Sequence, residues 1–298
     1  MRKEEPLLGP NDLSLCCGTV RHADFRQLVE AAGTNGYRAI SLWPHLYLNA
    51  RTQGLSDIDL RNILKDNDVV IAELDPLCNW IPGCELPAAP GDITPAFYNA
   101  IKSFFSYGED LFFRIADTLG GRHLNLVQLI PPAIDPHIVG DAFGGVCDRA
   151  AQHGLLVSLE FLPWCPIANL TQGLEIVKIA NRPNGGLMFD TWHHFRSGGT
   201  SAELQRLPQG SIAAIQFNDA PRESTIDLLT ETLTARLLPG DGAIDLVGNI
   251  QAWDAMGTTA PVGVEIFSLE LDKLPPKEAA RRAADATRQV LALARAKY

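Results

Sequence analysis

Four oxygen-bearing side chains stand at the ends of short, mainly apolar runs in the second half of the chain. They are Glu160, Asp190, Gln216 and Glu265. A carboxylate in an apolar run is costly to bury unless it is paired or coordinated. Three carboxylates brought together repel one another, and a divalent cation is the simplest way to reverse that repulsion. The four residues therefore predict a single metal site.

Their spacing shows how they would meet. Glu160, Asp190 and Gln216 follow one another at intervals of about one strand-and-helix unit. Glu265 follows after one such unit and a long excursion over residues 219–241. In a parallel barrel, side chains at the carboxyl ends of the strands face a common mouth. We therefore expect one ligand from each of four successive strands.

Apolar runs alternate with amphipathic segments along the whole chain, a pattern typical of a parallel sheet covered by helices. The expected strands are Leu13–Cys17, Tyr37–Trp43, Val69–Leu74, Leu124–Leu129, Leu155–Phe161, Gly186–Phe189, Ile212–Phe217 and Val262–Ile266. The expected helices are His22–Ala32, Asp57–Lys65, Pro95–Leu119, Pro136–His153, Leu174–Ala180, Ala202–Leu207, Ile226–Leu233 and Pro275–Ala296. Eight such units in 298 residues predict an α/β fold, a (β/α)8 TIM barrel, with residues 1–298 forming one domain.

Two further features qualify this architecture. The alternative is a doubly wound open sheet, but no glycine-rich phosphate turn follows the first expected strand. Asp75-Pro76 suits a turn after the third strand, and the Pro- and Gly-rich segment Leu77–Pro95 suits a long loop with a role in binding.

Several neighbouring residues extend the expected pocket. His193 lies three residues after Asp190 and is favoured over His194 as an acid or base. Arg236 precedes a Pro-Gly-Asp-Gly turn and could hold an anionic or polyhydroxylated substrate, although a solvated loop arginine is the alternative. His45 and Trp43 follow the second strand and are further candidates for substrate contact.

Composition limits the partners. The net charge of −10 disfavours nucleic acid and anionic membranes, which need clustered Lys and Arg. No apolar run has the length of a signal peptide or of a membrane span, and the six cysteines match no zinc or redox motif. We expect a cytoplasmic protein with buried or free thiols and a small-molecule partner, and the sequence leaves open whether it forms a homo-oligomer.

The chain resembles the xylose isomerase-like superfamily of sugar isomerases and epimerases, which includes ketose 3-epimerases, inosose dehydratases and 3-dehydroshikimate dehydratases. The resemblance extends from Leu13 to the last helix. Its most specific parts are Leu159-Glu160-Phe, Asp190-Thr-Trp-His193, Gln216-Phe-Asn-Asp219, Arg236-Leu-Leu-Pro-Gly-Asp-Gly and Val264-Glu265-Ile.

The resemblance implies roles for these residues. Glu160, Asp190, Gln216 and Glu265 would bind one divalent metal. His193 would contact substrate and take part in proton transfer, and Arg236 would contact substrate.

The chain departs from the family pattern at two positions. Many isomerases of the family have His where this chain has Gln216, and an amide oxygen favours Mg2+ or Mn2+ over zinc. Some epimerases end the second strand with an acid, whereas here it ends Ser41-Leu42-Trp43.

The expected chemistry is removal of a proton next to a carbonyl. The metal would stabilise the charge that develops on the substrate oxygen. Glu160 and Glu265 would flank the metal, and one would take the proton from the substrate while the other returns it. The expected activity is that of an isomerase or epimerase that acts on a sugar-like, polyhydroxylated ketone.

Other reactions and roles remain alternatives. If a β-hydroxyl leaves, the same site is a dehydratase of the 3-dehydroshikimate or inosose dehydratase type, with His193 as base or acid. A metal-dependent endonuclease is less favoured because of the acidic charge and the lack of a His cluster. A non-catalytic sugar-binding barrel is the remaining alternative.

Overall fold

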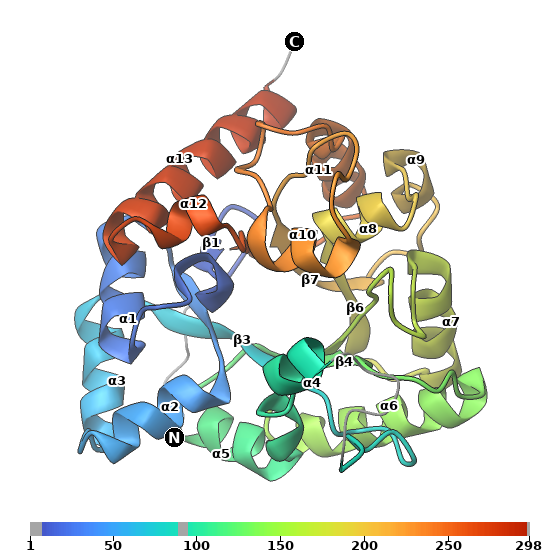
Figure 1. Cartoon of the computed structure of the whole chain (residues 1–298), viewed down its shortest axis with the longest axis horizontal. Coiled ribbons are helices and arrows are strands. Elements are labelled where there is room, and N and C mark those ends of the chain that lie inside the picture. The colour runs from blue at the N-terminus through green and yellow to red at the C-terminus, as the bar shows by residue number, and fades with distance from the viewer. Residues whose placement is uncertain (1–7, 89–94, 297–298) are drawn as a thin grey trace.

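Eight parallel strands close into a barrel in the computed structural model, which describes residues 8–88 and 95–296. The strands are β1 (Leu13–Leu15), β2 (Ala39–Leu42), β3 (Val70–Leu77), β4 (His123–Val127), β5 (Leu156–Glu160), β6 (Gly185–Asp190), β7 (Ile212–Phe217) and β8 (Val262–Val264). Each strand pairs with its sequence neighbours, and β1 pairs with β8. The expected (β/α)8 barrel is confirmed (Figure 1).

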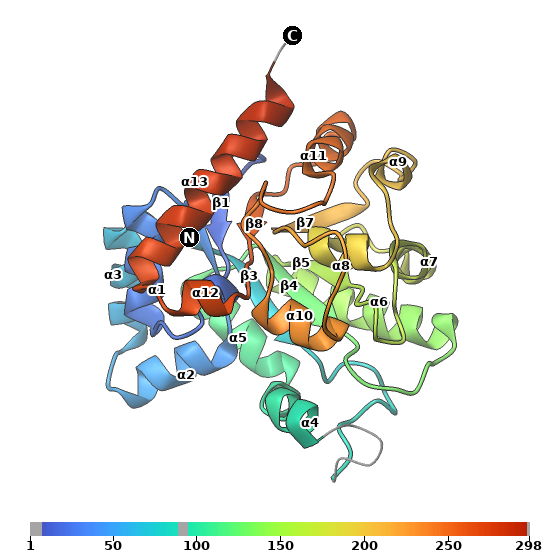
Figure 2. The ribbon, with the colours of Figure 1, turned by 45° about the horizontal axis from the view of Figure 1, so that its top comes forward.

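Helices surround the barrel and also cover one of its ends. They are α1 (Phe25–Thr34), α2 (Pro44–Thr52), α3 (Asp57–Asp66), α4 (Pro95–Ile101), α5 (Glu109–Leu119), α6 (Pro136–Gln152), α7 (Leu170–Ala180), α8 (Thr191–Arg196), α9 (Ser201–Leu204), α10 (Leu228–Thr234), α11 (Leu246–Ala255), α12 (Leu269–Asp272) and α13 (Pro276–Arg295). Two 3-10 turns, η1 (Cys17–Val20) and η2 (Phe104–Ser106), also lie within the described residues. Figures 1 and 2 place α4 and α10 on the same side of the barrel, in front of its mouth.

The single helix expected over Pro95–Leu119 is wrong. The segment is divided into α4, η2 and α5, because the chain is extended at Tyr107 and Gly108. Gly108 is the N-cap of α5, and Glu109 and Asp110 follow in its first turn, where negative charge is favourable. The hydrophobic spacing runs through this break, so the sequence pattern did not reveal it.

The third strand is longer than expected. It continues to Leu77 through Asp75-Pro76, so the predicted turn there is wrong. The register against β4 shifts between Leu74 and Leu77, which accommodates the proline inside a strand. The extension carries Asp75 into the barrel. Residues 78–88 form no helix or strand, as the loop prediction required, and residues 89–94 of that prediction lie outside the described residues.

Four helices were not anticipated: α2, α8, α11 and α12. The long excursion between β7 and β8 contains α10, near the helix expected there, and also α11, which packs on α9 and α13. All six cysteines are buried and free, as expected. Within residues 8–88 and 95–296, no helix combines the length and the apolar character that a membrane crossing needs.

Asp219, two residues past the end of β7, organises the loop after Arg236. Its carboxylate accepts hydrogen bonds from four backbone N–H groups: Ala220 at 2.8 Å, Gly240 at 2.9 Å, Gly242 at 3.0 Å and Ile244 at 3.1 Å. A Cβ on Gly242 would lie 2.3 Å from the Asp219 carboxylate, so the close approach requires glycine. The backbone at Leu237 pairs with Asp219, which fixes the adjacent Arg236 over the barrel.

Replacing Asp219 by Asn should lower the free energy of unfolding by about 1–3 kcal/mol, because an amide nitrogen cannot accept the backbone N–H groups that a carboxylate oxygen accepts. Urea denaturation measures the difference. Asp241→Asn is the matched control on the exposed surface of the same turn and should have little effect. Equal effects of the two substitutions would contradict this role for Asp219.

Candidate functional site

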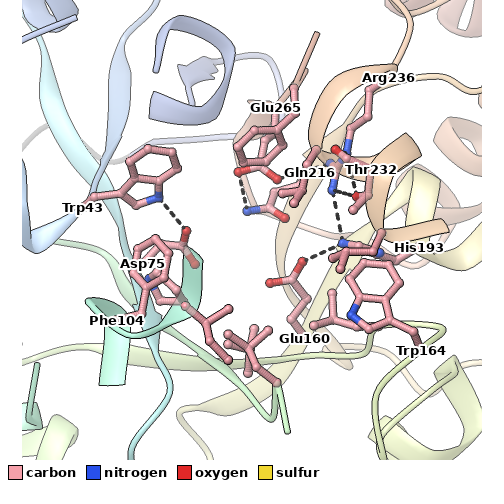
Figure 3. A pocket seen from close by; sticks show the side chains of 18 residues that line it. Trp43, Asp75, Phe104, Glu160, Trp164, His193, Gln216, Thr232, Arg236 and Glu265 are labelled. Carbon is pink, nitrogen blue, oxygen red and sulfur yellow. Dashed lines mark hydrogen bonds and ion pairs between the residues drawn. The ribbon is translucent and has the colours of Figure 1, made fainter. Parts of the chain in front are cut away.

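A pocket opens at the carboxyl ends of the strands, beneath α4 and α10, with about 740 Å³ of open space counted to its mouth. Its polar lining residues are Asp75, Glu160, His193, Gln216, Thr232, Arg236 and Glu265. Figure 3 shows Trp43, Asp75 and Phe104 on one side and Glu160, His193 and Trp164 on the other, with Gln216 and Glu265 between them. The remaining lining is aliphatic and aromatic, and the indole N–H groups of Trp43 and Trp164 are its polar side-chain atoms.

The four residues predicted as ligands all lie at this end of the barrel, and all are buried. Glu160 ends β5, Asp190 ends β6, Gln216 lies in β7 and Glu265 directly follows β8. Asp190 is wholly buried behind the pocket lining, whereas the other three line it. The structure thus places the four side chains around one region, as the strand pattern predicts.

A tighter group within this region includes a histidine. Ligand atoms of Glu160, Asp190 and His193 lie within 4.8 Å of one another. Glu265 lies outside that group and is joined to it through Arg236, whose Nη1 donates to Asp190 Oδ2 at 2.7 Å and to Glu265 Oε2 at 3.2 Å. The guanidinium therefore links carboxylates from two strands.

Arg236 has every N–H group directed at a protein acceptor. Besides the two carboxylates, Nε and Nη2 donate to Thr232 Oγ1, and Nη2 also donates to His193 Nε2 at 3.2 Å. The guanidinium carbon lies 5.2 Å from the ring of Phe267, so the group is stacked as well as bonded. Arg236 lines the pocket at 3% exposure, where it neutralises buried negative charge.

His193 faces the pocket and His194 does not. Asp190 caps α8 by accepting the backbone N–H of His193 at 2.9 Å, which fixes the imidazole over Glu160. His193 Nε2 lies 3.3 Å from Glu160 Oε1 and close to the Arg236 guanidinium. His194 instead turns toward the backbone oxygen of Thr200 at 3.1 Å.

His193 Nε2 lies next to both a hydrogen-bond donor, Arg236, and a carboxylate, Glu160. Arg236 can only donate to it, which requires a bare nitrogen, whereas the Glu160 carboxylate favours a protonated one. His193 Nδ1 has no hydrogen-bond partner among the described residues. This nitrogen therefore lies within reach of both a hydrogen-bond donor and a carboxylate oxygen.

Sequence reasoning missed two buried acids on β3, Glu73 and Asp75. Glu73 Oε1 accepts from Gln216 Nε2 at 2.9 Å. Asn125 Nδ2 donates to Asp75 Oδ1 at 2.9 Å and to Glu160 Oε2 at 2.7 Å, so it joins β3 to β5. The available clue was alternation, because residues two apart face the same side of a strand. Reading Asp75-Pro76 as a turn concealed it.

Trp43 and His45 have different positions. Trp43 lines the pocket, and its indole N–H donates to Asp75 Oδ2 at 3.1 Å. Asp75 of β3 therefore lies beside the end of β2. This is the strand that ends in Ser41-Leu42-Trp43, where some epimerases have an acid. His45 is not among the lining residues. It is half-buried in the first turn of α2, with its ring 5.5 Å from that of Trp43.

Burial and mutual repulsion dominate the electrostatics. Burial raises the pKa of Glu73 well above its ordinary value, and the nearby Asp75 and Glu265 add to the rise. Burial and Glu160 raise the pKa of Asp75 to about 7. Burial also raises the pKa of Glu265 strongly, despite the opposing charge of Arg236. All three shifts run in the same direction, toward the protonated form of the carboxyl group.

Asp190 has the opposite behaviour. Burial acts to raise the pKa of Asp190, but the charge of Arg236, the electrostatic effect of the His193 ring and the backbone N–H of His193 together hold it below its ordinary value. Among the site acids whose pKa is shifted, Asp190 is therefore the one in which the ionised form is favoured.

The hydrogen bonds around Gln216 indicate whether a cation fits this site. Its Nε2 faces the carboxylates of Glu73 and Glu265, at 2.9 and 3.4 Å, which fixes the orientation of the amide. Its Oε1 is buried and finds no hydrogen-bond partner among the residues described. An unpartnered buried oxygen is uncommon, because most buried polar atoms are bonded. Such an oxygen among carboxylates fits an oxygen-preferring divalent cation.

Replacing Arg236 by Met should lower the free energy of unfolding by about 3–5 kcal/mol at pH 7, because it leaves buried carboxylates without their partner. The guanidinium lowers the pKa of Asp190, so its contribution is complete above the ordinary aspartate pKa and is lost as the pH falls through the lowered value. Thermal and urea unfolding across pH should therefore show the difference between variant and parent shrinking in acid.

Arg282→Met on the exposed face of α13 is the control for loss of an arginine. It should have little effect at any pH. A cost for Arg236→Met that equals the control, or that does not change with pH, would contradict the assignment.

Comparison with known proteins gives a consistent picture. The model of the xylose isomerase-like TIM barrel family matches residues 29–290. Inosose isomerase of Bacillus subtilis (strain 168) is 33% identical over 153 residues, which are 51% of this chain and 54% of that protein. A 3-dehydroshikimate dehydratase of Pseudomonas aeruginosa is 30% identical over 135 residues, which are 45% of this chain and 21% of that protein. The chain thus spans about half the length, or less, of these curated relatives.

Solved structures share the barrel over nearly the whole chain. One described as IOLI protein with a binding zinc atom has a TM-score of 0.80 at 24% identity, covering 96% of this chain and 100% of that one. D-psicose 3-epimerase in the presence of D-fructose has a TM-score of 0.65 at 16% identity, covering 94% and 99%. At these identities the likeness confirms the fold.

Proposed function

The chain belongs to the xylose isomerase-like TIM barrel family, and from that premise we propose that it is a divalent-metal-dependent enzyme that removes a proton next to the carbonyl of a hydroxy ketone. The observation that carries the proposal is the unpartnered Oε1 of Gln216, held among buried carboxylates at the mouth of the barrel. The inosose isomerase relatives support an isomerase or epimerase as the first candidate reaction.

Glu160, Asp190, Gln216 and Glu265 would hold the cation. All four offer oxygen, and an all-oxygen donor set favours Mg2+ or Mn2+ over zinc. The similar structure described with zinc supports a divalent ion in this fold, and the choice of ion here follows from Gln216. When bound, the ion would polarise the substrate carbonyl and stabilise the negative charge that develops on its oxygen.

The chain's own groups would handle the proton. Glu160 and Glu265 approach the pocket from β5 and β8, so one can take a proton from one face of a substrate and the other can return it to the opposite face. His193 Nε2, 3.3 Å from Glu160, can relay that proton, and Asp190 fixes its orientation. Arg236 keeps Asp190 ionised and limits the repulsion at Glu265.

A dehydratase is the second candidate, and Asp75 is the observation that favours it. A lyase needs a base for the carbon-bound proton and an acid for the leaving hydroxyl. Asp75 lies across the pocket from His193 (Figure 3), and its pKa of about 7 leaves much of it protonated at neutral pH. The 3-dehydroshikimate dehydratase relatives give this alternative independent support.

The Mn2+-loaded protein should be incubated with candidate hydroxy ketones in deuterated water. We expect the substrate to take up deuterium at the carbon next to its carbonyl, and NMR and mass spectrometry measure that uptake. An isomerase or epimerase gives deuterium with no loss of water, whereas a dehydratase gives loss of water. Glu265→Gln should reduce either rate by about 10²-fold or more, since it removes a proton-transfer group. Absence of exchange with every ketone and metal would overturn the enzyme proposal in favour of a binding protein.

Gln216→Leu should weaken Mn2+ binding by about 10- to 100-fold, the range typical of changes around a metal site. Gln216→His should retain binding and shift preference toward Zn2+, because imidazole suits zinc better than an amide does. Competition with a metal indicator measures both. Gln128→Leu removes another buried glutamine, bonded to the backbone oxygen of Pro132, and serves as control. Wild-type affinity in Gln216→Leu would refute the ligand assignment.

A further inference from the structure

The pocket is polar at its base and apolar toward its mouth. Helix α10 contributes Leu229 and Leu233, and the segment of α4 and η2 contributes Ile101 and Phe104. Figures 1 and 2 place α4 and α10 together at the open end of the barrel. A substrate whose carbonyl reaches the carboxylates must therefore pass between these apolar side chains.

The apolar wall is packed in place. Ile101 belongs to a hydrophobic cluster, separate from the main core, that also includes Val127 and Leu162. Phe104 and Trp164 are partly buried against that cluster and face the pocket. Because the cluster joins side chains from α4, β4 and the loop after β5, the wall is a built surface of the fold.

Hydroxyl groups near this wall would find few partners. Trp43 donates to Asp75, and Arg236 donates to Thr232. Among the described residues of the wall, the indole N–H of Trp164 is the one side-chain donor left without a partner. A hydroxyl placed against Leu162 or Leu233 would lose its bonds to water without replacement, which is unfavourable. An apolar group placed there would gain by leaving water.

Charge adds a second constraint. Among the described residues that line the pocket, Arg236 is the single Lys or Arg, and its N–H groups are directed at protein acceptors. The other ionisable side chains near it, Asp75, Glu160 and Glu265, are acids and cannot bind an anion. A substrate carboxylate would therefore be buried with no cationic side chain available to bind it.

We propose that the substrate is an uncharged hydroxy ketone whose oxygens are gathered at one end, and whose other end is an apolar group that packs against this wall. The inference rests on the proposed function for the position of the carbonyl. It narrows the expectation of a polyhydroxylated substrate, because hydroxyls along the whole molecule would face the apolar wall. It also disfavours ketones that carry a carboxylate.

The test compares three probes on the Mn2+-loaded protein: 1-hydroxy-4-phenylbutan-2-one, D-fructose and 3-dehydroshikimate. Isothermal titration calorimetry measures their affinities. The phenyl ketone should bind at least about tenfold more tightly than either of the others, since its ring leaves water for an apolar wall. Equal or tighter binding of D-fructose or 3-dehydroshikimate would overturn the inference.

A matched pair of variants tests where the preference arises. Leu233 on α10 is 36% exposed and lines the pocket, whereas Leu48 on α2 is 37% exposed and does not. Leu233→Asn should reduce affinity for the phenyl ketone several-fold and leave D-fructose unchanged, while Leu48→Asn should alter neither. An unchanged phenyl ketone affinity in Leu233→Asn would contradict the proposed contact.

Deuterium exchange on the same samples separates this inference from the proposed function. Tight binding of the phenyl ketone without exchange of any probe would support the apolar subsite and overturn proton abstraction. Exchange of D-fructose at equal or tighter affinity would support proton abstraction and overturn the apolar subsite.

Discussion

The structure depends on how a barrel tolerates several carboxyl groups buried within reach of one another. Glu73 and Asp75 come from β3, Glu160 from β5, Asp190 from β6, and Glu265 follows β8. Charges of one sign in a low-dielectric interior must be protonated, hydrogen-bonded or offset by a cation. All three solutions occur here. The pKa values of Glu73 and Glu265 are raised, Asn125 and Gln216 donate to carboxylates, and Arg236 bonds Asp190 and Glu265.

Contacts in the neighbouring loop and helix fix the side chains that surround these carboxyl groups. Asp219 gathers the backbone N–H groups of the loop that carries Arg236, so the guanidinium is held over Asp190. Asp190 in turn caps α8 and fixes His193 beside Glu160. A metal bound at Glu160, Asp190, Gln216 and Glu265, as proposed, would replace repulsion among acids with coordination. The repulsion between these carboxylates, which destabilises the folded protein without a metal, would then favour binding of the ion.

The amino-acid sequence predicted the strands of the second half of the barrel well. Each of these strands has a polar residue at or next to its carboxyl end that interrupts an apolar run. For that reason Glu160, Asp190, Gln216 and Glu265 could be placed on successive strands from the sequence alone. Arg236 and His193 were found through their spacing from these strands. Their bonds to each other depend on the loop that Asp219 holds, and such long-range contacts leave no local pattern.

The first half was less predictable. Asp75 precedes a proline, which ordinarily ends a strand, so both Asp75 and the inward-facing Glu73 were missed. The break between α4 and α5 was hidden by continuous hydrophobic spacing. Ile101 and Phe104 lie at this break and line the pocket, so the break bears on the proposed substrate preference. The apolar wall is thus a tertiary feature, assembled from segments whose individual sequences indicate only burial.

Crystals of the protein soaked with Mn2+ would test the central claim most directly, by anomalous diffraction at the manganese edge. The account predicts one strong peak at the base of the pocket, bounded by carboxylate oxygens of Glu160, Asp190 and Glu265 and by Oε1 of Gln216. A peak confined to surface acids, or a pocket that stays free of manganese at millimolar concentration, would contradict it.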